Sequence, residues 1–340
     1  MMKARYAWIL PLIFLSAGFA QNFTATPLTD FQTGQLYLGA FAGTLYENSN
    51  VIPVDHAADG LGFAQQIQPL DSKGHPSPTG KIVVISIGMS NWTIEWCSLS
   101  RSACTPDSFL VQAAQNSQVN HTTLVLVNCA KGGQSADRWI DNSFGNYTQC
   151  TQAIQKAGVT DLQVQAILYK DALEFPTQSL IPSTQCSATS VVDACAYEHD
   201  VGTTARFVRT QFPNVKEMFV HSRIYGGYAS PGTLNPEPFA YEYGFSTKWL
   251  IEAQINQIRT GVIDPTAGDL SYTAAPWLAW GPYFWTAGPT KRSDGLSWLP
   301  FQYIQDQTHP GEPGTLQVST QMIDFYLTSE FSKWFVAGGK

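Results

Sequence analysis

The sequence predicts a three-layer α/β/α protein in which helices cover both faces of a mainly parallel central sheet. Four nearly continuous apolar runs are typical of strands buried on both faces, and they lie at residues 82–87, 123–127, 164–169 and 218–220. The stretches between these runs are long enough for helices. Because strand and helix alternate along the chain, we expect right-handed crossovers and parallel pairing.

The expected helices lie between and after these runs. Segments 109–117 and 194–212 separate predicted strands, and 245–259 is amphipathic. Segment 315–335 closes the chain, and its apolar residues share one helical face. We therefore expect a terminal helix that packs on the sheet.

The first 20 residues have the pattern of a secretory signal peptide. Lys3 and Arg5 supply the positive start, residues 7–15 are apolar, and Gly18 and Ala20 are small residues before the expected cleavage site. The apolar run is shorter than the roughly 18 residues that a membrane span needs. The sequence thus predicts a secreted or periplasmic protein that leaves the membrane after cleavage.

The remaining chain divides into an N-terminal arm and a main domain. Residues 21–78 are rich in Thr, Gly, Asn and Pro and have no clean helical period, so an extended arm is expected. Residues 79–340 form the predicted domain, with a long aromatic loop insertion at 276–300.

Charge is low and slightly negative. Charged residues make up 13% of the 340 residues, and the net charge is −7. This composition has no basic patch for nucleic acid or an anionic membrane and favours a neutral substrate.

The six cysteines predict disulfides, because an even number behind a signal peptide is typical of exported proteins. Spacing cannot decide among the 15 arrangements that six cysteines allow. We predict the pairs that close the shortest loops, and a zinc site is disfavoured because no C-x-x-C occurs. The predicted pairs are Cys97–Cys104, Cys129–Cys150 and Cys186–Cys195.

Chemistry in open parallel sheets gathers beyond the carboxyl ends of the strands. Ser90 follows the first run on a Gly88-Met89-Ser90 turn, and Gly132-Gly133 follows the second. Asp306 and His309, three residues apart, precede the last helix and can place a carboxylate behind an imidazole. Each motif alone is ordinary, but together they describe a nucleophile, an oxyanion loop, an acid and a base.

In this chain order the motifs resemble the SGNH/GDSL family of serine hydrolases, whose fold is flavodoxin-like. The resemblance implies that Ser90, His309 and Asp306 are catalytic and that the N–H groups of Ser90 and Gly133 bind the oxyanion. The family's third block usually supplies an Asn where this chain has Lys170. Lys170 is then either a third oxyanion donor or a structural residue paired with Asp171 or Glu174.

Five further residues are predicted to line the substrate cleft. Two come from the aromatic loop, where four of the ten Trp fall within 22 residues, although most of these rings are expected to pack the loop itself. Arg223 either lines the mouth or bridges loop carbonyls. The five residues are Asn91, Gln134, Arg223, Trp280 and Trp285.

The sequence therefore predicts a secreted serine esterase that needs no metal or organic cofactor. An acylated carbohydrate is the expected substrate, with removal of acetyl the expected reaction, although another neutral ester remains open. Alternatives are a non-catalytic glycan-binding or surface protein on the same fold, or a lipase or polyester hydrolase with the same triad.

Overall fold

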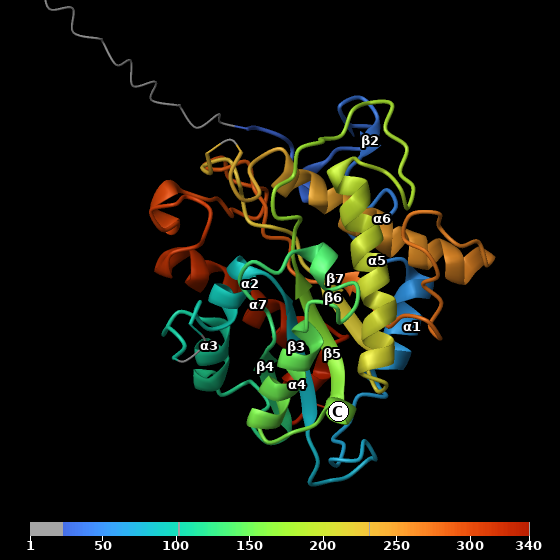
Figure 1. The fold of residues 1–340 in the computed structure, drawn as a ribbon, viewed down its shortest axis with the longest axis vertical. Helices are drawn as coiled ribbons and strands as arrows, with labels where there is room; N and C mark the ends of the chain where they lie inside the picture. The colour runs from blue at the N-terminus through green and yellow to red at the C-terminus, as the bar shows by residue number, and fades with distance from the viewer. Residues whose placement is uncertain (1–22, 101–102, 231, 340) are drawn as a thin grey trace, which may run out of the picture.

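The computed structural model describes residues 23–100, 103–230 and 232–339, and a five-stranded parallel sheet lies at its centre (Figure 1). The strand order is β4-β3-β5-β6-β7, and every neighbouring pair is parallel. This arrangement confirms the predicted fold class. The strands are β3 Ile82–Gly88, β4 Leu124–Asn128, β5 Val164–Lys170, β6 Glu217–Val220 and β7 Trp277–Trp280.

Helices cover both faces of this sheet. In Figure 1, α4 and α5 lie in front of the strands and α7 lies behind them. Helix α6 packs along α5, and α7 packs against α2 and α3. The helices are α1 Val54–Ala64, α2 Ser90–Trp96, α3 Phe109–Gln115, α4 Asn146–Lys156, α5 Asp193–Gln211, α6 Phe239–Thr260 and α7 Glu312–Thr328. Short 3-10 helices lie at Leu28–Asp30, Ala136–Arg138, Asp161–Gln163, Pro300–Gln302 and Lys333–Phe335.

The fifth strand, β7, differs from the prediction, which assigned residues 276–300 to a loop. Residues 277–280 pair with β6, with Glu217 opposite Trp277. The run is only four residues long, so it is too short for a reliable pattern, and the pairing with β6 stabilises it. The rest of the segment is irregular, as expected.

The N-terminal segment also differs from the expected extended arm. It contains a small hairpin, β1 Leu36–Tyr37 with β2 Phe41–Ala42, and the 11-residue helix α1. Helix α1 can approach the sheet because Gly60 leaves room for Trp277: an added Cβ would lie 2.3 Å from that ring. The Trp277 indole N–H also donates to the His56 carbonyl at 3.0 Å. The predicted signal peptide lies outside the described residues.

The three disulfides of the structure are the predicted ones. Cys97–Cys104 closes the loop after α2, Cys129–Cys150 joins the end of β4 to α4, and Cys186–Cys195 joins a long loop to α5. Among the described residues, we find no helix that combines the length and apolar character needed to cross a bilayer.

Candidate active site

Ser90 lies at the carboxyl end of β3, where the chain turns directly into α2. Gly88 ends the strand beside β5, and any side chain there would collide, because an added Cβ would lie 2.0 Å from the Lys170 carbonyl oxygen. The backbone N–H of Ser90, in the first turn of α2, has no intrahelical acceptor. Ser90 is 7% exposed, so most of its surface is covered by neighbouring residues.

His309 and Asp306 complete a chain of hydrogen bonds with this hydroxyl. His309 Nε2 lies 2.7 Å from Ser90 Oγ, and His309 Nδ1 lies 2.6 Å from Asp306 Oδ2. Since an ionised carboxylate can only accept, the Nδ1–H group donates to Asp306, and Nε2 accepts from the Ser90 hydroxyl. The fold thus brings together residues that are 219 positions apart in sequence.

The geometry of Asp306 favours its ionised form. Partial burial disfavours the charge, but the backbone N–H groups of Thr308 and His309 donate to Oδ1 at 2.9 and 3.0 Å. These bonds and the His309 ring together hold the pKa of Asp306 below its ordinary value. The carboxylate can therefore orient the imidazole and stabilise an imidazolium.

The loop that carries His309 is tied to the helix that carries Ser90. Asn91 Nδ2 donates to the carbonyl oxygen of Thr308 at 3.2 Å, and the Ile304 N–H donates to the His309 carbonyl at 3.0 Å. Asn91 is fully buried, so it does not line the substrate cleft as predicted. The sequence shows that Asn91 is adjacent to Ser90, but it does not show that its side chain bonds to the Thr308 carbonyl.

The glycine loop after β4 approaches Ser90 from the other side. The Lys131 N–H donates to the Gly88 carbonyl at 2.9 Å, and an added Cβ on Gly132 would lie 3.8 Å from Ser90 Cβ. Gly133, which the sequence analysis expected to supply an oxyanion N–H group, has a φ of +70°. An added Cβ on Gly133 would have no heavy atom within 4 Å. Gly132 is therefore the glycine closer to Ser90. The Gly133 carbonyl accepts a hydrogen bond from Arg138 Nη1 at 2.5 Å.

Lys170 does not serve as an oxyanion donor. Its side chain has no exposed surface, and Nζ lies 2.5 Å from both carboxylate oxygens of Glu95 on α2. The expected alternative partners are also wrong, since Glu174 pairs with Arg138 at 3.1 Å and Asp171 makes no ion pair in the described residues. The pair instead joins helix α2, which also carries Ser90, to the end of β5.

Burial sets the electrostatics of this ion pair. Loss of solvation lowers the pKa of Lys170 to about 8 and raises that of Glu95, while their mutual attraction opposes both changes. The rings of Trp92 and Phe284 lie 5.4 and 5.1 Å from Nζ and enclose the ammonium group. The Lys170–Glu95 pair is thus a buried support beneath the site.

Three other residues predicted to line the cleft differ from one another in how deeply they are buried. Trp280 and Trp285 are buried, and their indole N–H groups donate to the Leu45 carbonyl at 2.6 Å and to Glu237 at 2.7 Å. Both are core residues, so the prediction is wrong for them. Gln134 is half-buried and accepts from Asn146 at 3.0 Å.

Arg223 follows β6 at the same edge of the sheet and is 3% exposed. Its Nε and Nη1 atoms have no hydrogen-bond partner in the described part of the chain. The expected bridge from Arg223 to loop carbonyls is therefore absent there. Asp171 Oδ2 is also buried without a partner.

No protein-family model matches this chain, and no curated protein matches it in sequence. Among solved structures, it is similar to the salicylyl-acyltransferase SsfX3 from a tetracycline biosynthetic pathway, with 14% identity and a TM-score of 0.35. That match covers 74% of this chain and 55% of the acyltransferase, so this chain spans about half of that protein's length. An extracellular lipase from Streptomyces rimosus matches with 10% identity and a TM-score of 0.31, over 71% of this chain and 99% of the lipase.

Proposed function

We propose that this protein is a serine ester hydrolase with Ser90 as nucleophile, His309 as general base and acid, and Asp306 as the orienting carboxylate. The observation that carries the proposal is the continuous relay from Ser90 Oγ to His309 and from His309 to Asp306, with both distances below 2.8 Å. A hydroxyl that donates to an imidazole held by a carboxylate is poised to lose its proton.

The reaction follows from this arrangement. Ser90 Oγ attacks the ester carbonyl while its proton passes to His309 Nε2. The imidazolium then protonates the departing alcohol and leaves an acyl group on Ser90. A water molecule, deprotonated by His309, attacks the acyl-enzyme, and the acid is released as Ser90 regains its proton.

The oxyanion of each tetrahedral intermediate needs hydrogen-bond donors close to Ser90. The backbone N–H groups of Ser90 and of the Gly132-Gly133 turn are suited to this role, since no described residue accepts a hydrogen bond from them. Gly132 is the closer of the two glycines, so we assign the second donor to it.

We extend the proposal to a secreted esterase that removes acetyl groups from carbohydrate. The three disulfides and the predicted export signal support an oxidising compartment, and the low charge supports a neutral substrate. The aromatic loop no longer supports sugar stacking, because Trp280 and Trp285 are buried. The carbohydrate part therefore depends on export and charge alone.

Hydrolysis of a short-chain nitrophenyl ester tests the reaction. The wild-type protein should hydrolyse it, and Ser90→Ala should reduce kcat/KM by at least about 10³-fold. Ser143→Ala, on an exposed loop, is the matched control and should retain the wild-type rate. Equal rates in wild type and Ser90→Ala would refute the assignment.

A panel of acetylated xylan, pectin and xanthan tests the substrate class, with released acetate as the readout. Hydrolysis of long-chain esters in preference to all three polysaccharides would identify a lipase or polyester hydrolase. Glycan affinity with no ester hydrolysis would identify a non-catalytic binding protein.

A further inference from the structure

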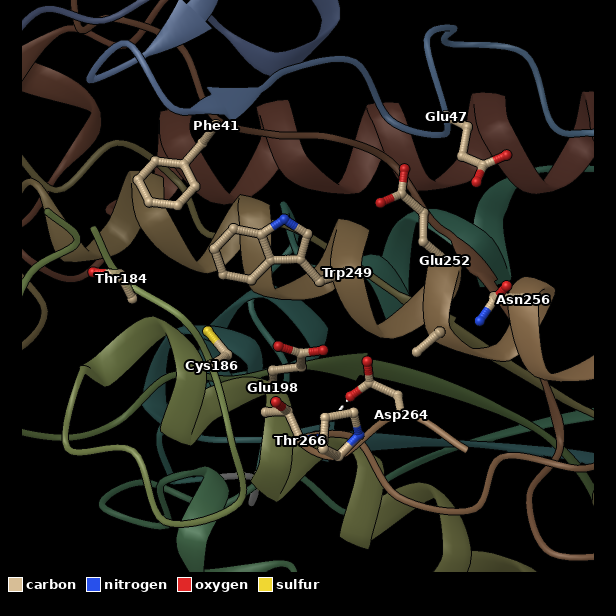
Figure 2. A pocket seen from close by; sticks show the side chains of 12 residues that line it. Phe41, Glu47, Thr184, Cys186, Glu198, Trp249, Glu252, Asn256, Asp264 and Thr266 are labelled. Atoms are coloured by element: carbon tan, nitrogen blue, oxygen red, sulfur yellow. Dashed lines mark hydrogen bonds between the residues drawn. The ribbon is translucent and has the colours of Figure 1, made fainter. Parts of the chain in front are cut away.

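A pocket lies between α5, α6 and the N-terminal segment, and none of the three triad residues lines it (Figure 2). Its volume is about 450 Å³, which is enough for a small organic molecule. Phe41 and Trp249 form an aromatic wall, with ring centroids 5.8 Å apart. Carboxylates on the surrounding elements form much of the remaining lining.

Glu198 is the feature of this pocket that points to a ligand. The residue is only 3% exposed, yet its carboxyl group makes no hydrogen bond or ion pair with any described residue. Figure 2 shows the carboxyl group in the pocket, between Trp249 and Asp264. An unpaired buried carboxyl group is costly, and a ligand that pairs with it would remove that cost.

The cations near the pocket are already engaged by other carboxylates. Lys248 pairs with Glu252, and Arg259 pairs with Glu47 at 3.1 Å. Asp264 Oδ1 accepts the Thr266 N–H at 2.7 Å, but no cation among the described residues pairs with Asp264. The carboxyl groups of Glu198 and Asp264 therefore have no cationic partner among the described residues.

We propose that this pocket binds a small organic ammonium ion, with its charge beside Glu198 and its methyl or methylene groups against Trp249 and Phe41. Aromatic faces attract ammonium groups, and the nearby carboxylates add a direct charge interaction. A bare metal ion is a poorer fit, since no group of three metal-ligating side chains was found among the described residues. The site is separate from the proposed esterase reaction.

Proton release is a consequence of this binding mode. Burial, followed by the charges of Asp264 and Glu252, raises the pKa of Glu198 well above its ordinary value, which favours the protonated carboxyl group in the empty pocket. An entering cation favours the carboxylate, and the proton leaves to solvent. Affinity should therefore rise with pH while Glu198 remains protonated in the empty pocket. The charged or titratable groups around Glu198 are Asp264, Glu252, Glu47, Lys248 and His199.

Calorimetric titration with choline tests the proposal on the full chain. The matched ligand is 3,3-dimethylbutan-1-ol, which has the same shape with carbon in place of the charged nitrogen. Choline should bind at least about tenfold more tightly than this alcohol. Its binding enthalpy should depend on the buffer, as release of one proton requires.

Glu198→Gln removes the charge and preserves the shape, and it should weaken choline binding at least about tenfold and abolish the pH dependence. Trp249→Leu should weaken choline binding about three- to thirtyfold. Glu330→Gln, an exposed control elsewhere, should bind choline like the wild type. Thermal unfolding and ester hydrolysis should stay near wild type in Glu198→Gln, which shows that the variant is folded.

Three outcomes would overturn the proposal: equal affinity for choline and its neutral isostere, unchanged choline binding by Glu198→Gln, or absence of choline binding by folded wild type. Binding of neutral sugars in place of choline would also overturn it and would identify a carbohydrate pocket. None of these results depends on whether Ser90 hydrolyses esters.

Discussion

Two clusters of polar residues lie at the same edge of the sheet, and they differ in access to solvent. In the triad, the Asp306 side chain is 44% exposed and the His309 side chain 12% exposed. In the Lys170–Glu95 pair, both side chains are fully buried. Both clusters contain a short hydrogen bond to a carboxylate, so bond length does not separate them.

Access to solvent separates their roles. The side chains of Asp306 and His309 keep part of their surface exposed, whereas those of Lys170 and Glu95 have none. A buried ion pair contributes by holding its partners in place, and loss of one partner leaves an uncompensated charge. We therefore expect changes in the triad to alter the reaction and changes in the buried pair to alter stability.

The largest expected effect is on the reaction. His309→Ala removes the base and should reduce kcat/KM for a nitrophenyl ester by about 10³- to 10⁴-fold. The free energy of unfolding should change less than for a fully buried residue, because the His309 side chain is 12% exposed and that of its partner Asp306 is 44% exposed. Steady-state kinetics and urea unfolding measure the two quantities, and a large loss of stability would contradict the proposed division of roles.

The buried pair should show the reverse pattern. Lys170→Met leaves Glu95 without its partner and should reduce the free energy of unfolding by about 3–5 kcal/mol. The double variant Lys170→Met with Glu95→Gln should recover part of this loss, because no unpaired charge remains.

The matched control for this variant is an exposed ion pair. Asp55→Asn breaks the pair between Arg259 and Asp55, whose distance is 2.5 Å, and should cost at most about 1 kcal/mol. Equal losses from Lys170→Met and Asp55→Asn in urea unfolding would contradict the importance of burial.

Asn91 joins the helix that carries Ser90 to the loop that carries His309 and should have an intermediate effect. Asn91→Ala removes the hydrogen bond to the Thr308 carbonyl, so the His309 loop is held less firmly. We expect kcat to fall about tenfold while KM stays near wild type, since a misplaced base slows chemistry more than binding. A rise in KM at constant kcat would show instead that Asn91 acts on substrate binding.

The last expected effect is a dependence of stability on pH that arises outside both clusters. Burial raises the pKa of Glu237 to about 7 and that of Glu242 to about 8, from an ordinary value of 4.5. The folded state thus holds protons that the unfolded state has released, and stability falls as pH rises from about 5 to 8. The melting temperature should decrease over this window.

Glu242→Gln removes one of the carboxyl groups that the folded state keeps protonated. The decrease of the melting temperature between pH 5 and 8 should therefore be smaller in this variant. Glu330→Gln, whose side chain is exposed, should leave the slope unchanged. A melting temperature that rises from pH 5 to 8 in the wild type would contradict the assigned direction.

Local pattern was sufficient for much of the fold. The apolar runs at residues 82–87 and 164–169 are continuous because these strands are buried on both faces, and the structure has strands there. The triad was also predictable, since chain order and the spacing of Asp306 and His309 are properties of sequence. The three cysteine pairs that close the shortest loops are the pairs that the structure has, although spacing alone could not decide among the arrangements.

The helix and the strand that the sequence analysis did not predict have a common physical cause. Residues 54–64 and 277–280 carry weak local patterns, and contacts between Gly60 and Trp277 and the pairing with β6 stabilise them. The aromatic composition of residues 276–300 was read correctly as packing for most of its rings. None of the four Trp side chains in this segment faces solvent, and their indole N–H groups donate to distant acceptors, such as Glu237 for Trp285.

The sequence by itself determined which residues could carry acyl-transfer chemistry: a serine after a strand, a glycine pair after the next strand, and an acid three residues before a histidine. Tertiary structure decided which charges reach solvent. Glu95 lies 75 positions from Lys170, and the two meet because β5 lies beside β3, so no local pattern could show that this ammonium group is enclosed. Burial is a property of neighbours brought together by folding, and it separates the groups available for chemistry from those that hold the site in place.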